Sequence, residues 1–157
     1  MDKIKIQLSP TKRVDDAIVF WPHEGPDVNF RVDLMDFSKT VQPGLAKVVY
    51  AFDVFSILQP NEAIKFFKGI WEMLPENGEI YIIENDFDYM NRSLLSGDLP
   101  IGEFNESFRR ATYVNQQYLI NLLAEAGFDV KEMRLWQDGL KFPKQHFEFI
   151  LSAKKTK

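Results

Sequence analysis

Seven short stretches of the chain have the hydrophobic pattern of β-strands. Residues 4–8 alternate strictly between apolar and polar side chains, as half-buried strands do, and 17–21 is a continuous apolar run bounded by turn residues. β-branched and aromatic side chains, which favour extended backbone, fill 47–53. The predicted strands, in chain order, are 4–8, 17–21, 28–32, 47–53, 79–84, 130–136 and 147–153.

In the middle of the chain the apolar residues repeat with a helical period. The run from Ala63 to Leu74 places its apolar side chains on one helical face, and Pro75 and Gly78 follow as stop signals. We therefore predict a helix at 61–74 that packs on the sheet. A predicted strand follows it directly, and this order is typical of an α/β layer.

The stretch after the fifth predicted strand shows neither the apolar–polar alternation of a strand nor the apolar repeat of a helix. We expect residues 85–111 to form a long irregular loop, and the large apolar residues within it indicate that it packs against the domain. Thr112 is the expected N-cap of the next helix, whose apolar stripe runs from Tyr118 to Ala126. Gly127 is the expected left-handed end of that helix.

The connection between the first two predicted strands is unusually short. Eight residues separate Leu8 from Ala17, whereas a parallel crossover normally needs about a dozen or more, usually including a helix. Two alternatives follow. Either the first helix is reduced to a turn that begins at Ser9, or these two strands are not parallel neighbours.

Composition and charge exclude several classes of function. The chain has 157 residues, a length that fits one domain spanning 1–157, since cores tend to split only beyond about 250 residues. Its net charge of −4 comes without a basic stripe, which argues against nucleic acid as a partner. The absence of cysteine excludes disulfides and thiolate chemistry. No stretch has the length of a signal peptide or a membrane span, so we expect a cytoplasmic protein that does not enter membranes.

The chain also lacks the patterns of common metal and hydrolytic sites. His23 and His146 are its two histidines, and they form no H-x-x-x-H pattern, so we predict no metal site. Ser56 lies outside any G-x-S-x-G elbow, which argues against a serine hydrolase.

Two stretches resemble small class I S-adenosylmethionine-dependent methyltransferases. The first reads F-D-V-F-S-I-L at 52–58, continues into a proline-started helix and ends with L-P-E-N-G at 74–78. In the family, this register holds the end of the fourth strand, a helix and an L-K-P-G-G turn before the fifth strand. The second reads E-A-G-F at 125–128 and is similar to the family's E-E-A-G-F. The resemblance implies an α/β fold with a Rossmann-like methyltransferase sheet, mostly parallel with an antiparallel C-terminal strand, and with reduced N-terminal helices.

The first half departs from the family where its cofactor binds. Short members open with a pattern such as L-N-L-G-C-G, and an acidic residue follows at the end of the second strand. When this pattern is aligned with the chain from Ile4 without gaps, Gln7 and Ser9 take the places of the two glycines. Phe20 takes the place of the acidic residue. Glycines there allow close backbone approach and left-handed dihedrals, and the carboxylate would bind the ribose hydroxyls.

These departures set our expectation for the cofactor. A buried polar group left without a partner costs ~1–3 kcal/mol. We therefore expect S-adenosylmethionine binding to be weak or lost, with a dissociation constant on the order of 0.1 mM or worse. Phe20→Asp is expected to restore part of the affinity.

Carried over residue by residue, the resemblance implies the following cofactor-binding positions: Ser9, Phe20, Asp33, Leu34, Phe52 and Asp53. Asp33 follows the third strand, where the family places a side chain near the adenine, and the alternative is an Asp that caps a turn. Asp53 ends the fourth strand and either lines the same crevice or is a solvated strand end. Trp21, Phe52 and Phe55 are expected to cluster around this crevice and either fill it or form a partner surface.

The candidate substrate contacts follow the fifth strand and the long loop. They are Asn85, Asp86 and Arg109. For Arg109 and Arg110 an anion contact is one interpretation, and a solvated pair is the more ordinary one. No catalytic residue is assigned.

Two functions from different classes stay open. The first is S-adenosylmethionine-dependent methyl transfer to a small-molecule or glycan-like acceptor, which the expected sheet order and the acids Asp33 and Asp53 favour. The second is a catalytically inactive methyltransferase-like scaffold that acts as a binding or assembly module, as a homo-oligomer or with a protein partner. The residues Gln7, Ser9 and Phe20 favour the second.

Overall fold

A seven-stranded sheet organises the computed structural model, which describes residues 3–12, 14–107, 110–135 and 148–156. The strands are β1 (Ile4–Leu8), β2 (Ala17–Trp21), β3 (Phe30–Arg31), β4 (Ala46–Phe52), β5 (Glu79–Asn85), β6 (Phe128–Leu135) and β7 (Glu148–Lys155). Their order across the sheet is β3-β2-β1-β4-β5-β7-β6. The first five strands pair in parallel, and β7 runs antiparallel to both β5 and β6. The predicted mostly parallel sheet with an antiparallel C-terminal strand is confirmed.

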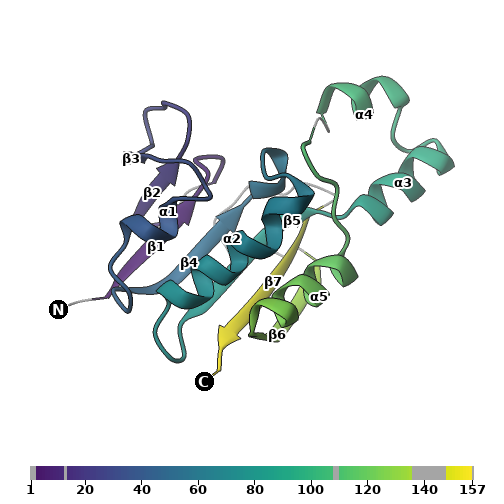
Figure 1. The fold of residues 1–157 in the computed structure, drawn as a ribbon. Helices are drawn as coiled ribbons and strands as arrows, with labels where there is room; N and C mark the ends of the chain where they lie inside the picture. The colour runs from purple at the N-terminus through teal and green to yellow at the C-terminus, as the bar shows by residue number, and fades with distance from the viewer. Residues whose placement is uncertain (1–2, 13, 108–109, 136–147, 157) are drawn as a thin grey trace.

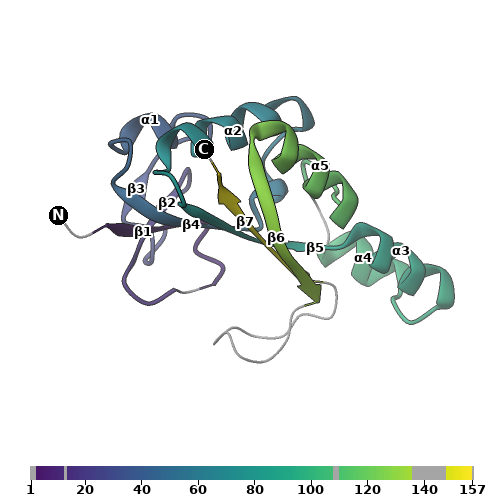
Figure 2. The same cartoon turned by 90° about the horizontal axis from the view of Figure 1, so that it is seen from below.

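The helices are distributed unevenly over this sheet. They are α1 (Phe37–Thr40), the short 3-10 helix η1 (Val54–Ser56), α2 (Pro60–Met73), α3 (Phe87–Ser96), α4 (Ile101–Ser107) and α5 (Gln116–Ala126). α1, α2 and α5 lie together on one face of the sheet, whereas α3 and α4 project beyond its edge (Figures 1 and 2). The main hydrophobic core lies between α1, α2, α5 and the sheet. None of the described helices is long and apolar enough to cross a membrane.

The short connection after β1 explains the uneven distribution. β1 and β2 are parallel neighbours, with Leu8 opposite Phe20, and the described residues between them form turns without a helix. The first of the two alternatives is therefore the correct one. The connections from β1 to β3 cross the sheet in one direction, and those from β3 to β5 cross it in the other. Because such connections are right-handed, helices in the two sets would lie on opposite faces of the sheet. Because β1 and β2 are followed by loops, the described residues place no helix on the face opposite α2 (Figure 2).

Most predicted elements form close to their expected bounds. The predicted helix at 61–74 is α2, and the strand at 79–84 lies inside the sheet between β4 and β7. β3 is shorter than the predicted 28–32. Next to it, the Asn29 amide donates to the Val19 carbonyl at 3.0 Å, but the Val19 amide donates to the side-chain Oδ1 of Asn29 at 2.8 Å and not to a backbone carbonyl. The last two strands begin and end within two residues of their predicted bounds where these are described, and residues 136 and 147 lie outside the described residues.

The expected long loop at 85–111 is wrong. This stretch holds α3 and α4, and a small cluster is formed by Met90 of α3, Leu99 of the connection between the helices and Phe104 of α4. Two short helices interrupted at Gly97, where the backbone φ is +85°, are too brief for a clear helical period.

The N-cap of α5 also differs from the expected one. Asn115 caps the helix by accepting a hydrogen bond from the Tyr118 amide at 2.8 Å. Thr112 is buried instead, and its hydroxyl donates to the carbonyl of Leu58 at 2.6 Å. The Thr112 amide also donates to the carbonyl of Phe55 at 3.0 Å. Thr112 therefore hydrogen-bonds the segment before α5 to the η1 turn and to the residue two positions after it.

Candidate functional site at the carboxyl edge of the sheet

The strand order reverses between β1 and β4, and this place in an open α/β sheet is where ligands usually bind, outside the carboxyl ends of the strands. The segments that follow β1, β2, β4 and β5 all emerge at this edge. Among the described candidates, those at or just after these strand ends are Ser9, Phe20, Phe52, Asp53, Asn85 and Asp86, whereas Asp33 and Leu34 follow β3. Glu148, the first residue of β7, joins them because β7 is antiparallel and begins where β5 ends.

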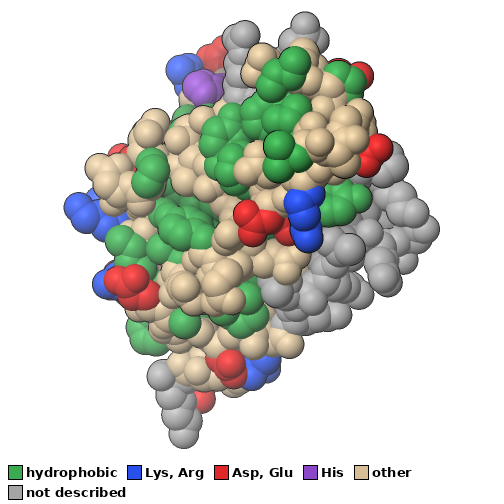
Figure 3. All heavy atoms as spheres, turned by 90° about the vertical axis from the view of Figure 1, so that its right-hand side faces the viewer, with side chains coloured by type: hydrophobic (Ala, Val, Ile, Leu, Met, Phe, Trp, Pro, Cys, Tyr) green, Lys and Arg blue, Asp and Glu red, His purple; other side chains and the backbone are tan. Residues whose placement is uncertain are grey.

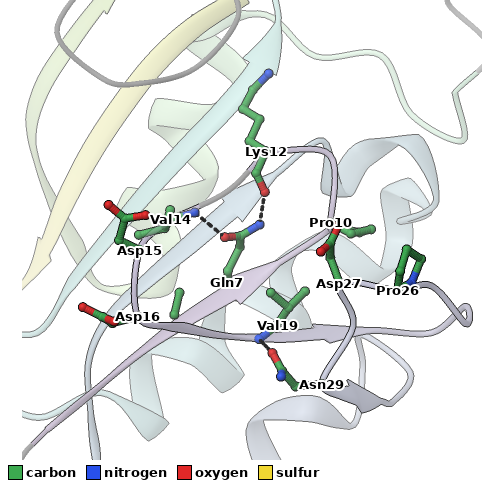
Figure 4. Close-up of a pocket in the computed structure, with 11 residues that line it drawn as sticks. Gln7, Pro10, Lys12, Val14, Asp15, Asp16, Val19, Pro26, Asp27 and Asn29 are labelled. Atoms are coloured by element: carbon green, nitrogen blue, oxygen red, sulfur yellow. Dashed lines mark hydrogen bonds between the residues drawn. The ribbon is translucent and has the colours of Figure 1, made fainter.

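The loop after β1 is held by a side chain of its own strand. Gln7 is 1% exposed; its amide nitrogen donates to the carbonyl of Ser9 at 2.8 Å and to the carbonyl of Lys12. Its oxygen accepts from the Val14 amide at 2.9 Å, and Figure 4 shows Gln7 reaching into this loop. Ser9 has a backbone φ of +78°, the left-handed region that glycine normally occupies. The chain therefore keeps the glycine-like backbone at Ser9 and fills the concave side of the loop with Gln7.

A larger hollow lies beside this loop, on the sheet face that has no described helix. Its volume is about 640 Å³, and it is lined by residues of the β1–β2 and β2–β3 connections, among them Asp15, Asp16 and Asp27 (Figure 4).

Phe20 points into the main core rather than toward the edge. Its ring stacks on Phe30 with centroids 5.1 Å apart and lies 6.0 Å from the ring of Phe37. Phe20→Asp would therefore bury a carboxylate among aromatic rings, which costs several kcal/mol. This geometry argues against our expectation that the substitution restores affinity.

The segment after β3 turns sharply. Asp33 is exposed, and its carboxylate accepts a hydrogen bond from the Met35 amide at 2.8 Å, as in the turn-capping alternative. Leu34 is buried. Both residues line a hollow of about 110 Å³. Its other lining residues are Pro22, Met35, Ile57, Leu58 and Glu62. Pockets for drug-sized ligands usually enclose about 300–1,000 Å³, so this hollow is much smaller than a typical cofactor site.

Phe52 lies on the opposite face from the other two predicted crevice aromatics. It packs with Ile83 and Ile150, whereas Trp21 and Phe55 belong to the main core. The expected single cluster of three aromatics is therefore wrong, because Phe52 points to the face opposite its strand neighbour Ala51, whereas Phe55 comes after the strand, in η1, and packs in the main core. All three side chains are buried, so they form no exposed partner surface.

Arg110 closes the crevice between the ends of β4 and β5. Its side chain is 7% exposed and forms ion pairs with Asp53 and, at 2.6 Å, with Glu84. The second oxygen of Glu84 accepts from the Phe55 amide at 3.2 Å, and Asp53 adopts a left-handed backbone with φ of +53°. The expected solvated arginine pair is wrong for Arg110, whereas Arg109 lies outside the described residues.

Burial dominates the electrostatics of this network. Complete burial raises the pKa of Glu84 to about 7, although the attraction of Arg110 acts in the opposite direction. Burial opposes the charge of Arg110, but its attraction to Glu84 and Asp53 outweighs that effect and raises its pKa above the ordinary value. The network can therefore take up a proton near neutral pH at Glu84.

A second buried ion pair lies next to it. Lys12 reaches from the β1 loop to Glu148 at the start of β7, with 2.7 Å between Nζ and Oε1 and with both side chains more than nine-tenths buried. Burial raises the pKa of Glu148, and the hydrogen bond from Lys12 opposes that shift. Asn85 lies opposite Glu148 in the sheet. Asp86 caps α3 by accepting from the Asp88 amide at 3.1 Å.

The structure thus brings Asp53 and Asn85 to the carboxyl edge, and it reveals Lys12 and Glu148 as neighbours that sequence reasoning did not assign. Arg110, for which an anion contact was one interpretation, contacts the carboxylates of Asp53 and Glu84 there. The signal available for Glu148 is a single charged residue next to the apolar run 149–151 at the start of a strand. For Lys12 no local signal exists, because its partner is 136 positions away. Among the described residues, no group of three or more metal-ligating side chains gathers, and His146 lies outside them.

Comparisons with known proteins identify the fold. Neither a protein-family model nor a curated protein matches the chain. It is similar in structure to an S-adenosylmethionine-dependent methyltransferase from Archaeoglobus fulgidus, with a TM-score of 0.71 and 14% identity over 98% of this chain and 86% of that one. This chain has a class I methyltransferase-like fold.

Other methyltransferase structures show the same likeness. A putative methyltransferase from Bacillus halodurans matches with a TM-score of 0.63 and 11% identity, over 99% of this chain and 94% of that one. Human N-acetylserotonin methyltransferase, solved in complex with S-adenosylmethionine, matches with a TM-score of 0.57 and 14% identity over 90% of this chain and 41% of its own. The methyltransferase-like fold thus accounts for nearly the whole chain.

Proposed function

We propose that this chain is a methyltransferase-like binding module that does not hold S-adenosylmethionine as a tight cofactor. The observation that carries the proposal is the hollow of about 110 Å³ at the ends of β3 and β4, which is too small for a nucleoside with an amino-acid tail. Two further features support it. Gln7 fills the concave side of the β1 loop, and the side chain of Phe20 is buried against Phe30 and Phe37, so the end of β2 presents no carboxylate from this position.

The residues present fit the cofactor poorly for a physical reason. The Arg110 guanidinium already forms ion pairs with both Asp53 and Glu84 at the end of the crevice, so a sulfonium cation entering there would have to compete with it for these carboxylates. Breaking a buried ion pair by removing one partner typically costs about 3–5 kcal/mol. A cofactor would have to supply that free energy in addition to opening the hollow.

A calorimetric titration of the protein with S-adenosylmethionine tests the proposal. We expect a dissociation constant on the order of 0.1 mM or worse, because each missing recognition group costs about 1–3 kcal/mol. Human N-acetylserotonin methyltransferase, whose structure contains the cofactor, serves as the positive control in the same buffer. Micromolar binding by this chain would contradict the proposal.

One observation favours a second candidate, S-adenosylmethionine-dependent methyl transfer to a small-molecule or glycan-like acceptor. Ser9 retains the left-handed backbone that a glycine would have in the β1 loop, and Asp33 and Leu34 line the hollow at the end of β3. Methyl transfer relies mainly on positioning, so a loop that opens on binding would suffice. Micromolar cofactor binding in the titration would favour this candidate.

A further inference from the structure

A hollow lies between the first half of α3 and the start of α5. Its volume is about 310 Å³, and it is lined by Asp86, Asp88, Arg92, Gln116, Gln117 and Ile120. Pockets that hold small ligands usually enclose about 300–1,000 Å³. This hollow therefore has room for a small ligand, whereas the hollow of about 110 Å³ at the ends of β3 and β4 does not.

The hollow is open to solvent and has a mixed lining. Asp88, Arg92 and Gln117 are exposed, so a ligand can enter from solvent. Asp86, a candidate substrate contact of the sequence analysis, is 6% exposed and adds a buried carboxylate to the lining. The half-buried side chain of Ile120 adds an apolar wall. Charged groups of both signs and one apolar side chain thus face the same space.

The two carboxylates of the hollow have acceptor positions to spare. Asp86 accepts from the Asp88 amide at 3.1 Å and from the side-chain nitrogen of Gln116 at 3.2 Å. Asp88 accepts from the side-chain nitrogen of Asn115 at 3.1 Å. A carboxylate has about four acceptor positions, so the described hydrogen bonds leave positions on both side chains for a ligand's donors.

The arginine of the hollow does not pair with the nearby carboxylate. Asp88 and Arg92 lie four positions apart on α3, a spacing at which opposite charges normally attract each other on a helix. Among the described residues, however, no ion pair joins them. Asp88 contacts Asn115, and the Arg92 guanidinium lies 5.9 Å from the centre of the Tyr89 ring. The Cβ atoms of such side chains are about 5–6 Å apart, so one small ligand can contact both charges.

We propose that this hollow binds a free α-amino acid, with its ammonium group at Asp86 and Asp88 and its carboxylate at Arg92. An ammonium group has three donors, which match the acceptor positions of the two carboxylates. A guanidinium presents parallel N–H donors that match a carboxylate. Both charged groups of an α-amino acid are attached to one carbon atom, so their separation suits two side chains one helical turn apart. Ile120 provides the contact for an apolar side chain.

The inference rests on the proposed binding function and names its ligand class. Its test is a thermal-shift titration with L-leucine, compared with isoamylamine, which lacks the carboxylate, and with isocaproate, which lacks the amino group. We expect L-leucine to raise the melting temperature saturably, because a ligand that binds only the folded state stabilises it. Each analogue keeps the apolar part and loses one charged contact, so each should bind at least about tenfold more weakly.

Two variants and a control locate the site. Arg92→Gln should lower the affinity for L-leucine at least about tenfold without weakening the binding of isoamylamine. Asp88→Asn should lower the affinity for L-leucine without weakening the binding of isocaproate. Both positions are exposed, so we expect both variants to fold and to melt near the wild-type temperature without ligand. Lys68→Gln removes a positive charge from an exposed position of α2 and should bind L-leucine as the wild type does.

Three outcomes would overturn the inference: no saturable shift with L-leucine, equal binding of either analogue, or wild-type affinity for L-leucine in Arg92→Gln or Asp88→Asn. S-adenosylmethionine itself carries an α-amino-acid group, so its titration is repeated with Arg92→Gln. Micromolar binding that this variant leaves unchanged would contradict only the proposed function. Weak cofactor binding without an L-leucine shift would overturn only the inference, so the two failures are distinguishable.

Discussion

At the scale of single residues, Glu84 shows how the fold places charge where water cannot reach it. It lies at the end of β5, is 1% exposed and shares Arg110 with Asp53. Burial outweighs this pairing, and its pKa rises from 4.5 to about 7. The folded state therefore binds the Glu84 proton more tightly than the unfolded state does.

Glu84 predicts a pH dependence of stability with a definite sign. Between the ordinary carboxyl pKa and about 7, the folded protein holds more protons than the unfolded chain, so the free energy of unfolding falls as the pH rises. Over that range the loss due to Glu84 is about 3 kcal/mol. Glu84→Gln cannot titrate, so its free energy of unfolding should fall correspondingly less than that of the wild type when both are measured by urea unfolding across the range. Equal pH dependence of the free energy of unfolding in the two proteins would contradict the raised pKa of Glu84. Glu72→Gln, at an exposed position of α2, is the control for removing one carboxylate from the chain.

At the scale of elements, Gly127 joins α5 to two other parts of the fold. It ends the helix with a backbone φ of +105°, as the sequence predicts, and its carbonyl accepts from the indole nitrogen of Trp71 at 3.1 Å. The Trp71 ring in turn lies 4.0 Å below the ammonium group of Lys155 at the end of β7. One turn therefore connects α5, α2 and β7.

Gly127→Ala should destabilise the protein through two separate effects. A left-handed backbone costs a non-glycine residue about 1–2 kcal/mol, and a Cβ at Gly127 would lie 2.9 Å from the Trp71 indole nitrogen. Gly44→Ala is the matched control, because Gly44 has a φ of +81° and open space around it. We expect both variants to lower the free energy of unfolding in denaturant titrations, and Gly127→Ala to lower it more. Equal losses would show that Trp71 moves aside without cost.

At the scale of the whole molecule, α3 and α4 form a lobe that depends little on the main core. The lobe projects past the carboxyl edge in Figure 1 and has its own small cluster of Met90, Leu99 and Phe104. Leu95 and Ile101 are 87% and 61% exposed, and hydrophobic side chains gather on the side of the molecule shown in Figure 3. A small cluster and exposed apolar residues are typical of a unit with low local stability.

We expect the lobe to open without the rest of the fold. In native-state hydrogen exchange, amides of α3 and α4 should exchange through openings of lower free energy than amides of β4 and β5, which lie inside the sheet. The α5 amides provide an internal comparison, since α5 packs on the main core through Leu119, Leu122 and Leu123. Equal protection in the lobe and in β5 would show that the lobe unfolds only with the whole protein.

The sequence by itself determined the strands, α2 and the end of α5 at Gly127, because side-chain periodicity and glycine conformation are local properties. It also indicated the methyltransferase-like sheet and the loss of glycines in the β1 loop. The order of the strands and the lobe at 87–107 were decided by tertiary packing. The same holds for the site: Lys12 meets Glu148 across 136 positions, and Arg110 meets Asp53 across 57. Such pairs leave no trace in local pattern, since they arise only when strand register brings distant side chains to one edge and one face.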